Sequence, residues 1–358
     1  MSIDAIQEAR RQTEICNACR YCEGFCSVFP ALTRQKAFAD GDISHLANLC
    51  HNCRGCYYSC QYTEPHEFAL NFPAAPAEVR QESWERLAWP QPLARRFHES
   101  GVALAVVLVA ALAVIFALIQ MLPPTSGKGF YAYLAHGALV AVFTPAFLLP
   151  LLSVAVSLRR YWQETGGTRL QLRDVIGGLR AAANLKNLNG GQGQGCNFEY
   201  EDRYSDTRRW LHQAVMYGFL LCFASTSSGT ILHYVMDIPA PYGFFSLPKL
   251  FGVPGGLLLT IGAIGLAVLK IKADPKLGAV RVWGGEMAFI LLLGATGATG
   301  LALYAATGTV GVPLLLAIHL GSVLALFLLL PFSKMVHGFY RLSALIVEHQ
   351  KTRASRIE

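Results

Sequence analysis

The feature that most restricts how this 358-residue chain can fold is a series of six long apolar segments. A run of about 18 or more apolar residues has the length of a membrane-spanning helix. The six segments cover roughly residues 101–122, 131–157, 211–235, 253–271, 284–306 and 312–333. Before residue 101 the sequence is polar and rich in cysteine. The sequence therefore predicts an all-α fold in which a six-helix transmembrane bundle occupies residues 101–335.

Lysine and arginine alternate between the connecting loops, and this alternation predicts an orientation. The loop 123–130 contains only Lys128 and the loop 236–252 only Lys249, whereas the loop 158–209 contains nine basic residues and the tail 334–358 five. Basic loops favour the cytoplasmic side. We expect a protein of the bacterial inner membrane with its N-terminal domain, both termini and the long middle loop in the cytoplasm. Contact with the inner leaflet accounts for the net charge of +7, so no nucleic-acid partner is expected.

The polar N-terminal region contains two copies of one cysteine pattern, C-x2-C-x2-C-x3-C. The copies consist of Cys16, Cys19, Cys22 and Cys26, and of Cys50, Cys53, Cys56 and Cys60. This spacing is typical of a bacterial ferredoxin with two [4Fe–4S] clusters, in which the fourth cysteine of each run ligates the other cluster. We expect the first cluster on Cys16, Cys19, Cys22 and Cys60, and the second on Cys50, Cys53, Cys56 and Cys26.

Structural zinc and a disulfide framework are the alternatives for these cysteines. Zinc sites usually pair two cysteines with two more distant ligands. Disulfides need an oxidising compartment, and no signal peptide is visible at the start of the chain. Both runs depart from the ferredoxin pattern after the fourth cysteine, where Ser27 and Gln61 replace a proline. Cys196 and Cys222 are expected to be unrelated to the clusters.

The remaining polar segments divide the chain into parts. We expect a helical ferredoxin-like domain at 1–75 and a connector lying on the membrane surface at 76–100, because Trp84, Trp89 and several arginines suit the headgroup zone. Pro90 and Pro92 would interrupt a helix there. The loop 158–209 contains a glycine-rich stretch at 189–195 that is interpreted as a plain flexible turn, since it lacks the ending of a phosphate-binding loop. Residues 336–358 are expected to form a cytoplasmic tail.

Four histidines lie near the ends of the third and sixth apolar segments. A helix rises about 1.5 Å per residue, so each segment offers one imidazole near each membrane surface. We expect His212 and His337 to share the inner level and His233 and His319 the outer level, where each pair could hold a b-type haem. One or two haems are therefore predicted. The alternative is that each histidine is an ordinary interfacial polar group.

Other residues could modify the haem sites. His136 near the outer surface and His98 near the inner surface are reserve ligands, and His136 could also be a proton relay or a packing residue. Small residues such as Gly218 and Gly321 would allow a flat macrocycle to approach the helices.

The chain resembles the tricarballylate/citrate utilisation protein B family over essentially its whole length. The resemblance rests on residues 16–26 (CNACRYCEGFC), 50–60 (CHNCRGCYYSC) and 217–226 (YGFLLCFAST). More distantly, residues 330–337 (LPFSKMVH), with His319 upstream, resemble the last haem-binding helix of the respiratory nitrate reductase gamma subunit.

The resemblance implies an electron conduit. A soluble FAD-dependent dehydrogenase, similar to tricarballylate dehydrogenase, would oxidise a tricarboxylate, and this chain would reoxidise its flavin and pass electrons to the quinone pool. The chain would then be the electron-transfer subunit of an oxidoreductase system. It has no dinucleotide or flavin motif of its own. A membrane redox sensor, or a subunit serving another reductase or a corrin-biosynthesis system, remains an alternative.

Overall fold

The computed structural model describes residues 4–35, 37–122, 129–198 and 202–355. These residues form helices, and the described ranges contain no strand beyond one isolated bridge between Cys196 and Ser205. The predicted all-α fold is confirmed. Lys128, whose loop contributed to the predicted orientation, lies outside the described residues.

The N-terminal region forms a small helical domain around a buried core. Its helices are α1 (Ala5–Cys19), α2 (Phe29–Thr33), α3 (Asp40–Leu49), α4 (Gly55–Tyr58) and α5 (Ala74–Leu87), with a 3-10 turn at Glu23–Phe25. Trp84 of α5 is only 4% exposed, and its indole N–H donates a hydrogen bond to Asn48 Oδ1 of α3 at 3.0 Å. Much of the expected membrane-surface connector therefore belongs to the core of this domain, because Trp84 points inward, whereas Trp89 is exposed.

Each of the six apolar segments forms most of one long helix, although the predicted segments 101–122 and 312–333 extend past the ends of their helices and 131–157 begins before its helix. These helices are α6 (Gln91–Ile119), α7 (His136–Glu164), α9 (Thr207–Tyr234), α10 (Leu247–Lys272), α11 (Trp283–Ala305) and α12 (Val312–Leu329). All six are long and apolar enough to cross a membrane. α6 begins ten residues before the predicted segment, with Pro92 in its first turn, where a proline costs no helical hydrogen bond. The α6 backbone leaves helical geometry at Ser100 (φ −132°, ψ 29°).

Small residues let the long helices approach closely. A Cβ atom on Gly218 of α9 would lie 2.9 Å from the Gly255 carbonyl oxygen of α10. A Cβ on Gly321 of α12 would lie 2.9 Å from the Ala113 nitrogen of α6. This is the small-residue packing common between membrane helices. A neighbouring helix therefore fills the space beside both glycines, and the expectation that a haem macrocycle approaches the helices there is wrong.

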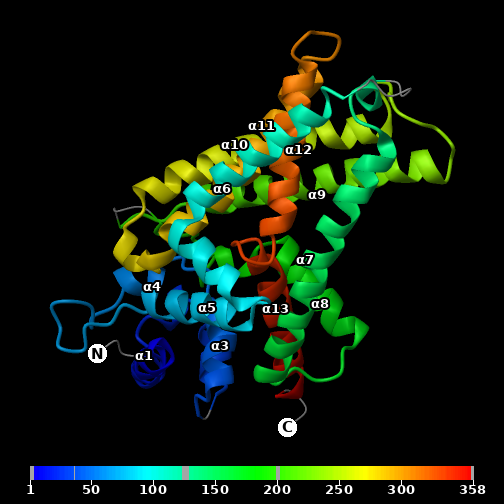
Figure 1. The fold of residues 1–358 in the computed structure, drawn as a ribbon. Helices are drawn as coiled ribbons and strands as arrows, with labels where there is room; N and C mark the ends of the chain where they lie inside the picture. The colour runs from blue at the N-terminus through cyan, green and yellow to red at the C-terminus, as the bar shows by residue number, and fades with distance from the viewer. Residues whose placement is uncertain (1–3, 36, 123–128, 199–201, 356–358) are drawn as a thin grey trace.

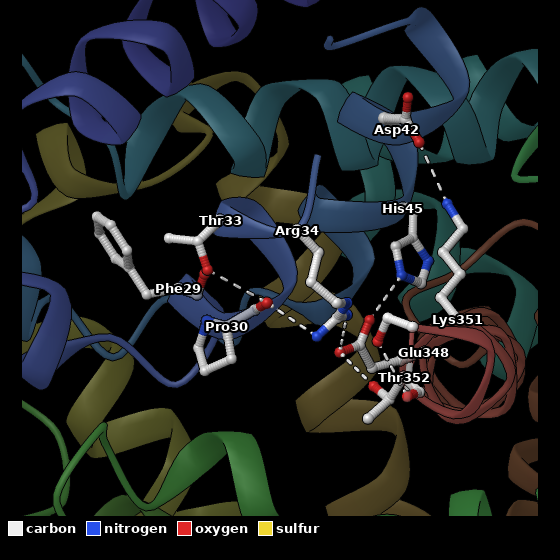
Figure 2. Close-up of polar contacts among 10 residues, drawn as sticks. Phe29, Pro30, Thr33, Arg34, Asp42, His45, Glu348, Lys351 and Thr352 are labelled. Atoms are coloured by element: carbon white, nitrogen blue, oxygen red, sulfur yellow. Dashed lines mark hydrogen bonds and ion pairs between the residues drawn. The ribbon is translucent and has the colours of Figure 1, made fainter. Parts of the chain in front are cut away.

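The C-terminal helix α13 (Val336–Ala354) packs against α3, α7 and α8 (Leu172–Ala183). Figure 1 shows α13 beside the N-terminal helices and the end of α7, at the end of the molecule away from α10 and α11. Figure 2 shows the contacts: the Glu348 carboxylate accepts hydrogen bonds from Arg34 and from His45 Nε2, the latter at 3.3 Å, and Lys351 pairs with Asp42 at 3.2 Å. The expected tail is thus mostly a helix docked on the cysteine-rich domain.

Candidate iron–sulphur and haem sites

Two small cavities adjoin at the end of α1, and Cys16, Cys22 and Cys60 line both of them. Cys19 lines one cavity, and Cys26 and Cys56 line the other. The apolar wall of the latter cavity is formed by Phe29, Leu70 and Phe72. Burial, followed by the neighbouring thiols, raises the pKa of Cys22 to about 12. Thiols held so close together in an apolar pocket become thiolates only when a cation neutralises them.

The second cysteine set lies beside the first and includes the last cysteine of the first run. Cys26 accepts a hydrogen bond from the thiol of Cys56, and this bond lowers the pKa of Cys26. Cys50 and Cys53 are 8% and 9% exposed. The structure therefore places Cys60 with Cys16 and Cys22, and places Cys26 beside Cys56 as well as beside the first set. The exchange of the fourth ligands and the occupation by clusters stay predictions.

The sulphur atoms line cavity walls instead of meeting at one point. Within the described ranges, no three cysteine, histidine or acidic side chains converge as ligands of a single ion. A zinc ion needs sulphur ligands about 2.3 Å from its centre, whereas a cubane is ligated at four separate corners. Four cysteines in each set supply the four thiolates that a cubane takes.

Backbone and side-chain groups also donate to these sulphur atoms. The backbone nitrogen of Asn52 lies 3.4 Å from Cys50 Sγ, and the backbone nitrogen of Tyr62 lies 3.3 Å from Cys60 Sγ. Gln61, which replaces the usual proline, places its amide nitrogen 3.8 Å from Cys19 Sγ. Such bonds stabilise thiolate charge and help to set a cluster's potential.

The segment 158–209 covers the second cysteine set. Its backbone amides at Gly191 and Asn197 donate to the carbonyls of Phe25 (3.2 Å) and Cys53 (2.8 Å). A Cβ on Gly191 would overlap the Gly24 carbonyl and lie 2.7 Å from the Cys26 nitrogen. The glycine-rich stretch is therefore not a plain turn, because glycine is needed where it meets the first cysteine run.

Ser27 explains the other departure from the ferredoxin pattern. Its hydroxyl donates to the Asn187 carbonyl at 3.1 Å, and the Asn187 side chain donates to the Leu49 carbonyl at 3.1 Å. A proline at position 27 could not make the first bond. This position thus fastens the covering segment to the cysteine-rich domain.

The inner histidine pair meets as the sequence predicts. His212 of α9 and His337 of α13 have ring centres 5.8 Å apart, with planes at 88°. Metal–imidazole bonds are about 2 Å long, so two imidazoles on opposite sides of one ion have ring centres roughly 6 Å apart. His337 Nδ1–H donates to the Lys334 carbonyl, which leaves Nε2 free as a ligand. Burial lowers the pKa of His337 and keeps it neutral. The pair fits bis-histidine ligation of a haem iron.

The outer pair differs from the expectation. His233 lies against His136, with ring centres 4.4 Å apart, and His136 Nε2 is 2.7 Å from the Tyr234 hydroxyl. His319 instead faces α11, where its Nδ1 lies 3.1 Å from Thr299 Oγ1. The start of α7 meets the end of α9, so the reserve residue His136 takes the place assigned to His319. Two rings at 4.4 Å must separate before an iron can enter between them.

His51 is a residue that reasoning from the sequence passed over. It directly follows Cys50, and its Nδ1 donates to the Leu49 carbonyl at 2.9 Å. Burial lowers the pKa of His51, and the nearby charges of Arg341 and His212 lower it further. His51 therefore lies close to His212 as well as next to Cys50. Its position inside a cysteine run could have identified His51 as a candidate from the sequence.

His98, the inner reserve ligand, is buried in α6 and 3% exposed. It faces α11, where its Nδ1 would lie 3.0 Å from a Cβ on Gly285. The close approach of α11 leaves this nitrogen without a hydrogen-bond partner within the described residues.

Two family models match this chain. The model described as citrate utilization protein B matches residues 98–358, and its Fer4-like domain matches residues 9–85. The chain belongs to the citrate utilization protein B family. It is 42% identical over 346 residues to citrate utilization protein B of Escherichia coli, which covers 95% of this chain and 90% of that protein. No solved structure matches the chain. The Fer4-like domain spans both cysteine runs and indicates iron–sulphur binding there.

Proposed function

We propose that this member of the citrate utilization protein B family is a membrane electron-transfer protein. It accepts electrons from an FAD-dependent dehydrogenase that acts on tricarballylate, citrate or a related tricarboxylate, and delivers them to quinone. Two [4Fe–4S] clusters and a b-type haem supply the one-electron chemistry when they are bound. The cysteine-rich domain and both ends of the chain face the cytoplasm.

The order of the sites along the molecule carries this proposal. The first cysteine set is the more open one, since Cys16 and Cys19 are half-buried and the neighbouring Tyr21 is 68% exposed. The second set lies beneath the segment 158–209, and His51 leads from it towards His212. Electrons from a soluble donor would arrive at the open set and leave through the histidines at the helical bundle.

The chain's own residues have distinct tasks in this scheme. The N–H groups of Asn52 and Tyr62 hold thiolate charge at Cys50 and Cys60. The covering segment keeps water from the second set. The Lys334 carbonyl fixes the tautomer of His337 so that Nε2 keeps a lone pair available to bind a metal ion. No proton is consumed until quinone is reduced.

A reoxidation experiment tests the proposal. The anaerobic purified protein is reduced with dithionite, freed of excess reductant and mixed with a short-chain quinone in detergent. We expect rapid reoxidation in the parent chain. His337→Ala should lose or alter the haem spectrum and slow reoxidation while the iron–sulphur signals persist. His349→Ala, on the same helix but 43% exposed, is the control.

Two outcomes would count against it. If His212→Ala and His337→Ala both keep an unaltered haem spectrum, the inner pair holds no haem and the ligands lie among His98, His136, His233 and His319. If quinone does not reoxidise the reduced parent chain, the conduit fails and a redox-sensor role gains support.

A further inference from the structure

Two arginines from distant parts of the chain converge on the second cysteine run. Arg80 of α5 donates through Nη1 to the carbonyls of Ala47 (2.8 Å) and Cys50 (2.9 Å). Arg341 of α13 donates to the Asn48 carbonyl at 3.3 Å. The charges of both guanidiniums act on the Cys50 thiolate. Arg80 is 8% exposed, so water screens this interaction little.

Two more arginines, Arg54 and Arg208, lie beside the same run. Arg208 donates to the Asn52 carbonyl at 2.8 Å, and its Nη1 lies 4.0 Å from Cys196 Sγ. Arg54 is only 4% exposed. The guanidinium carbons of Arg54 and Arg208 lie 4.5 and 4.0 Å from the centre of the Phe198 ring. The ring holds both cations in place beside the second set.

These four cations have no carboxylate partner among the described residues; their partners are carbonyls, the Asn52 side chain and the Phe198 ring. The nearby Glu286 is already bonded to Lys270 at 2.5 Å and to Lys334 at 2.6 Å, and Asp274 acts on Arg54 from beyond ion-pair distance. Arg54 and Arg80 are buried and Arg208 and Arg341 half-buried, and burying cations without an ion-pair partner is costly. The thiolates and cluster of the second set are the anion that would balance them.

The first cysteine set has different surroundings. The charges acting on Cys16 and Cys22 are those of other cysteines. Arg20 lies beside the cavity, but it is exposed and donates to the carbonyl and side chain of Asn17. The four arginines are therefore concentrated beside the second cysteine set.

A reduced cluster carries one more negative charge than an oxidised cluster, and nearby positive charge stabilises it. We infer that Arg54, Arg80, Arg208 and Arg341 raise the midpoint potential of the cluster on Cys50, Cys53, Cys56 and Cys26 above that of the cluster on Cys16, Cys19, Cys22 and Cys60. One electron then leaves the first cluster, which is oxidised, and joins the second, which is reduced, with no proton or bond exchanged. Transfer runs inward, towards His212 and His337. The inference rests on the proposed function because it needs both clusters.

A redox titration followed by electron spin resonance tests the inference on the anaerobic full-length protein. We expect two separate midpoint potentials. In Cys22→Ser, which loses a ligand of the first set, the surviving signal should be the one of higher potential. Arg341→Gln and Arg208→Gln should each lower the higher midpoint and leave the lower one in place. Arg341→Lys keeps the charge and should restore most of the shift, and Arg20→Gln is the exposed control.

The outcomes separate this inference from the proposed function. Equal midpoints, or a higher potential for the first cluster, overturn the inference while the clusters themselves stand. So does a higher midpoint that stays in place in Arg341→Gln and Arg208→Gln proteins with full iron content. A parent chain that binds no cluster contradicts the proposed function instead. Iron analysis of every variant distinguishes a shifted potential from a lost cluster.

Discussion

Glu348 joins the C-terminal helix α13 to the cysteine-rich domain, and replacing it with alanine gives a quantitative prediction. Its carboxylate accepts hydrogen bonds from Arg34, His45 and Thr352 (Figure 2). The side chains of Arg34 and Glu348 are 23% and 22% exposed, and that of His45 is fully buried. Breaking a buried pair costs about 3–5 kcal/mol, and an exposed pair contributes at most about 1 kcal/mol.

The intermediate exposure places the cost of Glu348→Ala at about 2 kcal/mol, midway between those limits. That cost corresponds to roughly 30-fold more frequent opening of α13. Hydrogen exchange read by mass spectrometry, at peptide level over 336–354, measures this opening. Glu99→Ala removes the partner of Arg95, whose side chain is 75% exposed, and should change α13 little. Unchanged exchange in α13, or an equal rise in every helix, would refute the docking account.

Three further predictions follow from single residues. Gly191→Ala should destabilise the covering segment by about 1–3 kcal/mol and speed the bleaching of one cluster in air. Gly284→Ala, where a Cβ meets nothing within 4 Å, is the control and should bleach like the parent chain; equal bleaching rates in the two variants would contradict the prediction. Burial lowers the pKa of His45 from 6.5 despite its bond to Glu348, so His45 takes up a proton more readily when α13 is undocked. Docking of α13 should therefore weaken as the pH falls below 6.5, which proteolysis of α13 measures; cleavage that slows in acid would contradict this prediction. Cys19→Ser should lose about four of eight irons, measured by iron analysis; an unchanged iron content argues against ligation.

The sequence predicted the parts of this fold that depend on local pattern. Each apolar segment satisfies its own backbone hydrogen bonds as a helix, so its length and composition are enough to predict it. The closeness of the two cysteine runs also agrees with their spacing. His212 and His337 could be matched because counting residues places both near the same membrane surface, although His337 begins the separate helix α13 and does not end α12.

What the sequence did not predict depends on contacts between distant segments. From the sequence, residues 336–358 are described only as a cytoplasmic tail, because nothing local in them indicates the partners of Glu348. These partners are Arg34, directly after α2, and His45 in α3. The segment 158–209 was interpreted as a loop because its glycines gain meaning only against Phe25 and Cys26. His319 was matched to His233 by depth alone, and depth does not specify the direction in which a side chain points around its helix.

The central claim is that the two cysteine sets hold two cubane clusters in series with the inner histidine pair. Iron and acid-labile sulphide analysis of the anaerobically purified full-length chain, combined with spin resonance of the reduced protein, tests it most directly. The account predicts about eight iron and eight sulphide per chain in the clusters, with two interacting reduced-cluster signals because Cys26 and Cys56 of the second set line the same cavity as Cys16, Cys22 and Cys60 of the first. A colourless protein that contains zinc and no sulphide would contradict it.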